Sequence, residues 1–356
     1  MAVQKDIDLN KPLDASNRPL LSKTQLTPEL SQASLNLHGD FYRQLQSKMN
    51  RHIFWHPVSC FYLFGIMTAA SIYRMWDYIV ISDSVVEFFS FFFKSRDFLF
   101  QLTTIFPVLI VVVGSLGLVC YMSSDDLKTV TDRLTRISYV EKLYGFNLRE
   151  FAKISDSEAA IKLSSSNVKL LKNGANSLLM VYRESPIAIV TLSPLIEQST
   201  PEKFIVEITG LHVRKVFGKV DFDALLLDWA ILRSRQIYQD YVDAKNIRNI
   251  DGNNIRLYIN GYTFDQGLTK LLKSKNFIAA QETFELNPFE PLNVNFLQKA
   301  IQKVFDIKRI TYGLNIITKN GDKDVLLNVA RESGFVNTEP VKEASTSSNK
   351  NLRKRK

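Results

Sequence analysis

Two long stretches of the chain contain no formally charged residue. They cover residues 53–73 (IFWHPVSCFYLFGIMTAASIY) and residues 98–122 (FLFQLTTIFPVLIVVVGSLGLVCYM). A run of about 20 apolar residues is long enough to cross the hydrocarbon core of a bilayer, which is about 30 Å thick. Core helices of soluble proteins are usually shorter or carry polar positions. The pattern therefore predicts two transmembrane helices, and a pair of buried core helices is the alternative.

The two apolar stretches are joined by a short connection, residues 74–97. Two spans so close together form a hairpin, which places both chain termini on the same side of the membrane. The first fifty residues are polar and the first apolar run is too long for a signal-peptide core, so we expect a retained anchor. Lys and Arg residues flank the hairpin slightly more often than they occur in the connection, which favours cytosolic termini.

The connection between the predicted spans is rich in phenylalanine. Around one glutamate and one serine it carries Phe88, Phe89, Phe91, Phe92 and Phe93. This segment is too charged to span a bilayer and too apolar to be fully solvated. One interpretation is an interfacial segment on the far leaflet. The other is a lateral docking surface for another membrane protein.

Beyond residue 123 the pattern becomes that of a soluble α/β domain. Apolar residues at helical spacing follow Asp125 and Asp126, which predicts that an amphipathic helix begins there. Strands are predicted over residues 177–183, 186–192, 204–213, 255–259 and 277–286, the first two as a hairpin. Helices are predicted over residues 220–242 and 264–273.

The composition adds a few exclusions. The chain has 356 residues, 46% of them hydrophobic, with a formal net charge of +9 and two cysteines. Two cysteines, both within apolar runs, exclude a disulfide framework, and no zinc site of the usual spacing is present. We expect no cofactor, no metal and no nucleic-acid partner. The predicted organisation is a polar cytosolic segment (residues 1–50), a transmembrane hairpin with a lumenal loop (51–123), a cytosolic domain (124–335) and a disordered basic tail (336–356).

The order of elements and the segment after the long strand resemble the GNAT acyltransferase fold. In active members the central strand ends in a valine and enters an arginine–glycine-rich turn, and the amides that open the next helix hold the pyrophosphate of coenzyme A. Here the strand ends at Val213 and the turn reads RKVFGKVDFDALLLDWA. Aligned without gaps, the family's arginine and glycines fall on Gly218, Lys219, Asp221 and Asp223, and a shift by one residue retains only Gly218. The resemblance implies a GNAT-like mixed sheet flanked by helices, with a degenerate cofactor site.

The residues in this turn oppose nucleotide binding. Asp221 or Asp223 is expected to cap the helix and to occupy amides that a pyrophosphate would need. Each carboxylate also repels a phosphate at about 4 Å by about 4 kcal/mol at an effective dielectric constant of about 20.

Two further positions bear on catalysis. Glu207 lies where several GNAT members carry the general base, although a structural strand carboxylate is the alternative. Leu272 replaces the tyrosine that many members use as general acid. We therefore expect a pseudo-acyltransferase domain that is not an enzyme. The alternative is a membrane-tethered N-acyltransferase that uses acetyl-CoA, with Glu207 as its base.

The N-terminal segment carries a second resemblance. Residues 1–4 (MAVQ), 17–20 (NRPL) and above all 34–57 (SLNLHGDFYRQLQSKMNRHIFWHP), followed by a hairpin, look like the fungal endoplasmic-reticulum (ER) packaging chaperones for inorganic phosphate transporters. The resemblance covers most of the chain. It implies a non-catalytic ER membrane protein that binds a multi-span phosphate transporter in the lipid bilayer. Such a protein assists folding, packaging or ER exit, by preventing aggregation or by recruitment to exit sites with vesicle-coat components.

The C-terminal tail, residues 344–356 (ASTSSNKNLRKRK), is predicted to be disordered. Arg353 and Lys354, fourth and third from the end, resemble a cytosolic dibasic ER-retrieval signal. The alternative is attraction of a basic tail to anionic lipid, which contributes about 1 kcal/mol per charge near the surface. Both interpretations place the tail in the cytosol. The expected location is the ER membrane, multi-pass, with cytosolic N- and C-termini.

Overall fold

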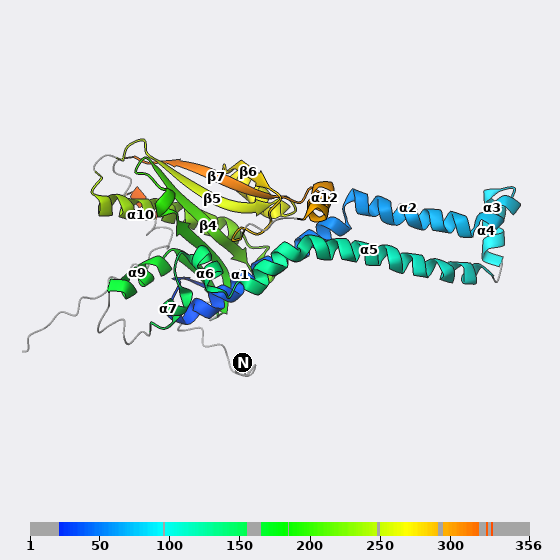
Figure 1. Cartoon of the computed structure of the whole chain (residues 1–356), viewed down its shortest axis with the longest axis horizontal. Coiled ribbons are helices and arrows are strands. Elements are labelled where there is room, and N and C mark those ends of the chain that lie inside the picture. Colours follow the sequence, from blue (N-terminus) through cyan, green and yellow to red (C-terminus); the bar gives the residue numbers. More distant parts are fainter. Residues whose placement is uncertain are drawn as a thin grey trace, which may run out of the picture.

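The computed structural model describes residues 21–94, 97–154, 165–183, 185–247, 250–290 and 295–319, together with residues 325, 326 and 329. Its helices are α1 (Ser31–Phe54), α2 (Pro57–Arg74), α3 (Trp76–Ile81), α4 (Val85–Lys94), α5 (Asp97–Arg133), α6 (Ile137–Tyr144), α7 (Leu148–Ala152), α9 (Ser165–Gly174), α10 (Phe222–Lys245), α11 (Gln266–Ser274) and α12 (Phe296–Val304). Its strands are β1 (Leu21–Gln25), β2 (Ser177–Tyr182), β3 (Ser185–Pro194), β4 (Lys203–Val213), β5 (Asn254–Tyr262), β6 (Ile278–Thr283) and β7 (Arg309–Ile317). In space the chain forms an α/β domain and a long helical arm (Figure 1).

A seven-stranded sheet lies at the centre of the α/β domain, in the order β1-β2-β3-β4-β5-β7-β6. β4 and β5 pair in parallel, whereas the other neighbouring strands pair antiparallel. A parallel pair needs a crossover connection, which α10 supplies between β4 and β5. α10 covers one face of the sheet, and α1 and α6 cover the other.

Each face of the sheet has its own apolar core, because side chains alternate between the faces along a strand. On the α10 side, Phe204 and Val206 of β4 pack with Leu226 and Ala230. On the α1 side, the core contains Leu37, Leu45 and Met49 of α1 together with Leu179 of β2 and Ile189 of β3. The domain is thus a three-layer structure in which α1 forms part of the third layer.

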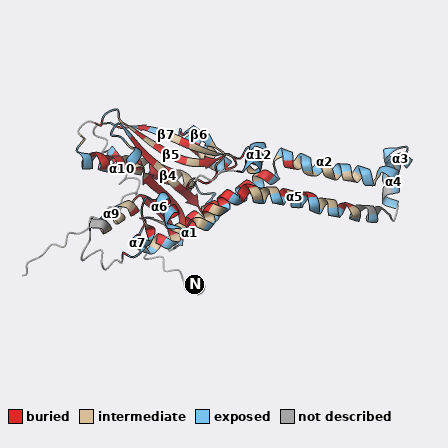
Figure 2. Ribbon diagram, in the orientation of Figure 1, coloured by how far each residue is buried: buried red, intermediate tan, exposed pale blue. Residues whose placement is uncertain are grey.

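The helical arm, hereafter the hairpin, consists of α2, α3, α4 and the part of α5 up to residue 122. α2 and α5 run side by side away from the domain, and α3 and α4 close the far end (Figure 1). Most of the hairpin surface is exposed or only partly buried (Figure 2). Among the described residues, one helix, Thr103–Arg133, is long and apolar enough to cross a membrane, and only 17% of its most apolar window is buried. α2 meets the same test only together with α1, across a bend of 48°.

The expected fold class is confirmed, because the structure is a mixed α/β sheet flanked by helices and preceded by apolar helices. β2 to β6, α10 and α11 lie where the sequence predicts them, with ends displaced by a few residues. β1, β7 and α12 are additional elements. The helix expected to begin near Asp125 and Asp126 does not begin there, since α5 continues unbroken from Asp97 to Arg133. No glycine or proline lies between Leu118 and Arg133 to stop it.

The N-terminal stretch also differs from the sequence-based division at residue 50. β1 pairs with β2 at one edge of the sheet. α1 buries Leu37, Tyr42, Leu45 and Met49 in the core. These positions follow one another at intervals of three to five residues, which places them on one face of the helix. Residues 21–54 therefore belong to the same packed unit as the strands that follow the hairpin.

Candidate functional site

β4 runs into the turn that corresponds to the degenerate cofactor site. The strand ends at Val213, a 3-10 helix covers Lys215–Phe217, and α10 begins at Phe222. Amides of this turn already donate to backbone carbonyls: Phe217 N to Arg214 O (2.8 Å), Gly218 N to Lys215 O (3.2 Å), Val220 N to Phe217 O (3.0 Å) and Phe222 N to Val220 O (2.6 Å). A bound pyrophosphate needs free amides. Of the four positions aligned with the family's motif, Gly218 is the one whose amide these hydrogen bonds engage.

The two aspartates of this turn act differently from the prediction. Asp221 occupies the N-cap position of α10, but its side chain accepts no hydrogen bond from the helix amides. Its backbone, at φ −69° and ψ 41°, is outside the extended conformation that directs a capping side chain back to the helix. Asp223 lies in the first turn of α10. The expected capping by Asp221 is therefore wrong, and the amides that open α10 make no hydrogen bond to its carboxylate.

A cleft of about 550 Å³ opens beside the turn. It lies between α1, the end of β4, the start of α10 and the start of α11. The structure brings together in its lining the four positions singled out by the sequence, Gly218, Lys219, Asp221 and Asp223. His212, at the end of β4, lines the same cleft.

The charges in this cleft are mixed, and α1 contributes one of them. The Lys48 ammonium lies 2.7 Å from a carboxylate oxygen of Asp265. The Asp265 side chain is buried and also accepts from Leu268 N at the start of α11. Burial raises the pKa of the Asp223 carboxyl, and the charge of Lys48 partly offsets this rise. Burial lowers the pKa of His212 to about 4, with a further decrease from Lys48 and Arg214. A nucleotide phosphate in this cleft would therefore meet carboxylates as well as lysine ammonium groups, beside a neutral histidine.

α1 fills the gap that opens between the two parallel strands. β4 and β5 pair only from Lys203 to Ile208, and beyond that point β4 continues without β5. Phe41 and Tyr42 of α1 line what remains of the gap, a space of about 20 Å³. One turn earlier on α1, His38 packs so closely on β4 that a Cβ at Gly210 would lie 2.2 Å from its ring. The interior of the sheet at this point is therefore occupied by side chains of α1.

Glu207 lines a second cleft of about 400 Å³, separate from the lining of the first. Asn260 on β5 donates to its carboxylate at 3.0 Å. Burial raises the pKa of Glu207, and the hydrogen bond from Asn260 opposes that rise. A raised carboxyl pKa suits proton transfer near neutral pH. Leu272, however, is fully buried in the core and has no ionisable group to complement Glu207.

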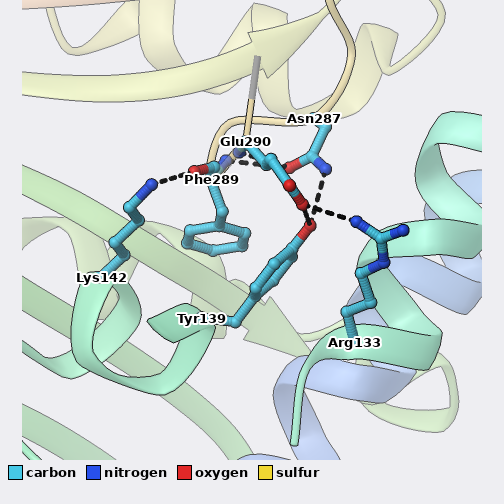
Figure 3. Close-up of polar contacts among 6 residues, drawn as sticks. All are labelled: Arg133, Tyr139, Lys142, Asn287, Phe289 and Glu290. Atoms are coloured by element: carbon cyan, nitrogen blue, oxygen red, sulfur yellow. Dashed lines mark hydrogen bonds and ion pairs between the residues drawn. The ribbon is translucent and has the colours of Figure 1, made fainter. Parts of the chain in front are cut away.

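A polar network lies beside this second cleft, and two of its residues line the cleft (Figure 3). The loop after β6 carries Glu290, whose carboxylate accepts from Arg133 Nη1 and from the Tyr139 hydroxyl, both at 2.7 Å. Asn287 donates to the Tyr139 hydroxyl at 3.1 Å, and Lys142 donates to the carbonyl of Phe289. The network holds the loop against α5 and α6, and Lys142 and Phe289 also line the cleft beside Glu207.

The phenylalanines of the predicted docking surface lie on α4, at the end of the hairpin farthest from the domain (Figure 1). The side chains of Phe89, Phe91 and Phe93 are exposed, and that of Phe88 is partly buried. The side chain of Phe92 lies outside the described residues, as do Arg353 and Lys354. α4 thus presents an apolar surface at the end of the arm.

The contribution of α1 was not predicted from the sequence. His38, Phe41, Tyr42 and Lys48 all reach the sheet or the first cleft from this helix. The apolar spacing that continues through Leu45 could have indicated a buried helix here. The many polar residues of the same segment concealed it.

Fold and site together define a GNAT-like α/β protein whose turn after β4 is partly hydrogen-bonded to its own backbone and whose domain carries an apolar helical arm. The family model of the inorganic phosphate transporter chaperone Pho86 matches residues 3–316. The chain therefore belongs to the inorganic phosphate transporter chaperone Pho86 family. Comparison with curated protein sequences gave no match.

Solved structures similar to this chain include GNAT acetyltransferases. The NatC complex bound to Gag peptide and CoA is 11% identical, with a TM-score of 0.27, and the match covers 50% of this chain and 88% of that one. Arabidopsis thaliana NAA60 with a bisubstrate analogue is 17% identical, with a TM-score of 0.28 and coverage of 44% and 84%. A GNAT-family acetyltransferase from Streptococcus pneumoniae is 17% identical, with a TM-score of 0.26 and coverage of 46% and 84%. The description of the fold rests on the strand order and pairing given above.

Proposed function

We propose that this protein is a non-catalytic ER membrane protein that binds a phosphate transporter directly and assists its folding, packaging or ER exit. The observation that carries the proposal is the hairpin, which presents large apolar side chains outside the core of the α/β domain. Membership of the phosphate transporter chaperone family supplies the class of client. The hairpin supplies a surface through which a membrane-embedded client can be reached.

The exposed hairpin side chains need a non-aqueous environment. Phe61 and Phe64 on α2 and Ile110 and Val111 on α5 are each at least 66% exposed. Leaving a large apolar side chain in water rather than burying it costs about 1.5–3 kcal/mol. α5 is long enough to span a bilayer, and the 18 residues of α2 give a length of about 27 Å at 1.5 Å per residue. We therefore place both helices in the membrane as a two-span hairpin with cytosolic N- and C-termini.

Within the membrane, α4 is the part of the hairpin that we assign to client contact. Phe93 is 73% exposed at its C-terminal end, and Phe89 is 50% exposed one turn earlier. Aromatic side chains contribute large contact areas at protein interfaces. The other interpretation is an interfacial helix that lies on the lumenal leaflet and contacts lipid alone.

Site-specific photo-cross-linking in native ER membranes tests this assignment. A photoreactive amino acid at Phe93 should cross-link to the phosphate transporter, in an amount that follows the phosphate state of the cell. The same group at Val216, which is 87% exposed on the α/β domain, is the matched control. Lipid adducts at Phe93 without transporter would contradict direct client binding through α4.

Replacement of the hairpin tests whether the hairpin has a role of its own beside that of the α/β domain. A variant in which residues 57–122 are exchanged for an unrelated two-span anchor keeps the α/β domain at the membrane. We expect this variant to lose transporter export from the ER. Full export with the foreign anchor would refute a role for the hairpin beyond anchoring.

The α/β domain is proposed to act by binding rather than by catalysis. The internal hydrogen bonds of the turn after β4 and the filling of the β4–β5 gap by Phe41 and Tyr42 support this. The rival is a membrane-tethered N-acyltransferase that uses acetyl-CoA, favoured by the raised pKa of Glu207 beside an open cleft. Isothermal titration of the full-length protein with coenzyme A separates the two. Saturable binding would support the rival, and its absence would support the binding role.

The basic tail is proposed to act in ER retention, through Arg353 and Lys354 as a retrieval signal recognised by vesicle-coat components. Replacement of both by serine should release the protein from the ER if this is correct. Retention of the doubly substituted protein, with reduced binding to anionic vesicles, would instead support lipid attraction.

A further inference from the structure

α12 is fixed at the point where the hairpin leaves the α/β domain. His52 Nε2, near the end of α1, lies 3.0 Å from the carbonyl oxygen of Phe305, the residue that follows α12. The His56 ring, at the start of α2, packs edge-on against the Phe305 ring at 5.2 Å. Figure 1 shows α12 beside the start of α2. If α2 and α5 enter a bilayer, α12 lies at the level where they do so.

α12 carries large apolar side chains on its outward side, unlike a surface helix that faces water. Its outward side carries Phe296, Leu297 and Val304, which are 84%, 64% and 53% exposed. Its inward side carries Ile301, which packs against the core, and Gln302, which is fully buried and whose side-chain oxygen and nitrogen have no hydrogen-bond partner. A surface helix of a soluble domain normally turns its apolar side to the core. The exposed side of α12 therefore fits an apolar environment outside the chain.

Basic residues border this apolar surface. At 100° per residue, Phe296, Ala300, Val304 and Leu297 occupy one continuous arc, and Lys303 and Lys299 follow at its edge. All six are exposed. An apolar face with lysines along one edge fits a helix that lies in the membrane interface, where the apolar side enters the acyl boundary and the ammonium groups reach the headgroups.

We propose that α12 is an interfacial membrane helix that holds the α/β domain against the cytosolic leaflet, with anionic lipid headgroups as its partner. The proposal rests on the insertion of the hairpin proposed above. Three observations select the lipid surface as the occupant: the position of α12 at the base of the hairpin, its apolar outer face and its lysine border. Trp55, 69% exposed between α1 and α2, adds an amphipathic ring of the kind found at this depth.

Spin-label accessibility in the full-length protein tests the proposal. Cys60 and Cys120 are replaced by serine, and a nitroxide is attached at F296C, at F61C on α2 or at V168C on α9. The protein is placed in nanodiscs that contain anionic lipid and no transporter. We expect the ratio of oxygen to water-soluble nickel accessibility at F296C to lie several-fold above that at V168C, and F61C to show the value of the bilayer interior.

The three labelled positions distinguish failure of the α12 proposal from failure of hairpin insertion. A lipid value at F61C with a solvent value at F296C would overturn the α12 proposal and leave the hairpin in the membrane. Solvent values at both would overturn the membrane insertion of the hairpin as well. Protection at F296C that appears only after addition of the transporter would identify this face as a protein-docking surface and reject the lipid partner.

A charge-reversal variant tests the headgroup contact itself. K299E/K303E leaves the apolar arc intact and removes the basic border. In the F296C background we expect its accessibility ratio to shift towards that of V168C in anionic nanodiscs and to change little in nanodiscs of neutral lipid. An unchanged ratio in anionic nanodiscs would reject the anionic headgroup as the partner.

Discussion

The same kinds of side chain have opposite environments in the α/β domain and in the hairpin. Leu227 on α10 is fully buried, whereas Leu118 on α5 is 60% exposed, although both helices are regular and rich in leucine. The domain offers α10 a sheet to cover, but the hairpin offers each helix only the other. Hydrophobicity in the sequence therefore does not decide burial within the chain. Burial within the chain depends on how many apolar surfaces can pack against one another.

Matched leucine truncations should show the largest contrast between the two regions. Leu227→Ala removes buried methyl groups and leaves a cavity, so the free energy of unfolding of the domain should fall by about 2–5 kcal/mol. Leu118→Ala removes a side chain that contacts little of the chain, and the domain should change by less than about 0.5 kcal/mol. Chemical denaturation of the protein in detergent, followed by the fluorescence of the buried Trp229, measures both.

Equal losses of unfolding free energy in the two leucine variants would contradict the independence of the hairpin and the domain. Such a result would mean that the hairpin and the domain unfold as one cooperative unit. The contrast is independent of any client, because it concerns only contacts within the chain.

An arginine substitution in each region should have the opposite outcome to the leucine truncations, with the larger effect in the hairpin. Ile110→Arg on α5 should reduce membrane insertion of the hairpin by about 3 kcal/mol, because arginine near the centre of a span is costly. Ile196→Arg lies on an exposed 3-10 helix of the domain, where the original side chain is 57% exposed. This control should change neither insertion nor stability. Resistance to carbonate extraction reports insertion, and full extraction resistance of the Ile110→Arg protein would argue against a spanning α5.

Glycine packing gives a third matched pair. A Cβ at Gly210 would lie 2.2 Å from the His38 ring, whereas a Cβ at Gly114 on α5 would meet nothing within 4 Å. Gly210→Ala should destabilise the domain by about 1–3 kcal/mol, because a well-packed interior resists added volume. Gly114→Ala should leave its stability unchanged. If Gly210→Ala were also neutral in thermal unfolding, α1 would not be held as tightly on β4 as the structure indicates.

The sequence predicted the part of the fold that local patterns encode. β2 to β6, α10 and α11 follow from alternation, helical spacing and turn residues. β7 was missed because Arg309 and the polar residues within it interrupt the apolar pattern of a strand that pairs on both sides. β1 was missed because LSKTQ has too few apolar residues, and its place at the edge of the sheet depends on pairing with β2.

The candidate site was predicted in its position but not in its detailed chemistry. Gly218, Asp221 and Asp223 do line one cleft. The hydrogen bonds between amides and carbonyls within the turn depend on backbone angles that no residue in it dictates. The blocking of the sheet by α1 depends on contacts across more than 150 residues, such as the 3.1 Å approach of His38 Nε2 to Thr191 Oγ1. Local sequence patterns do not encode such contacts.

The last contrast between the regions concerns the pH dependence of stability. His38 and His212 lie in the domain, and burial, before any neighbouring charge, lowers their pKa values to about 3 and about 4. The unfolded chain, with histidine pKa values near about 6.5, binds more protons than the folded chain below that pH. The contribution of each histidine to stability is therefore complete above pH about 6.5 and decreases as the pH falls towards its folded pKa.

His38→Gln isolates one of these contributions, because glutamine keeps a polar group able to reach Thr191 but does not titrate. Burial raises the pKa values of Glu207 and Asp223, whose contributions change with pH in the opposite direction, so the difference between the variant and the parent is the informative quantity. From pH 7 to pH 5 the parent should lose about 2 kcal/mol more than the variant. Denaturation curves across this range provide the measurement, with protease protection of the hairpin expected to stay constant. Parallel pH profiles would mean that His38 is already solvated in the folded protein, and the packing of α1 on Gly210 would have to be looser than the contacts described above allow.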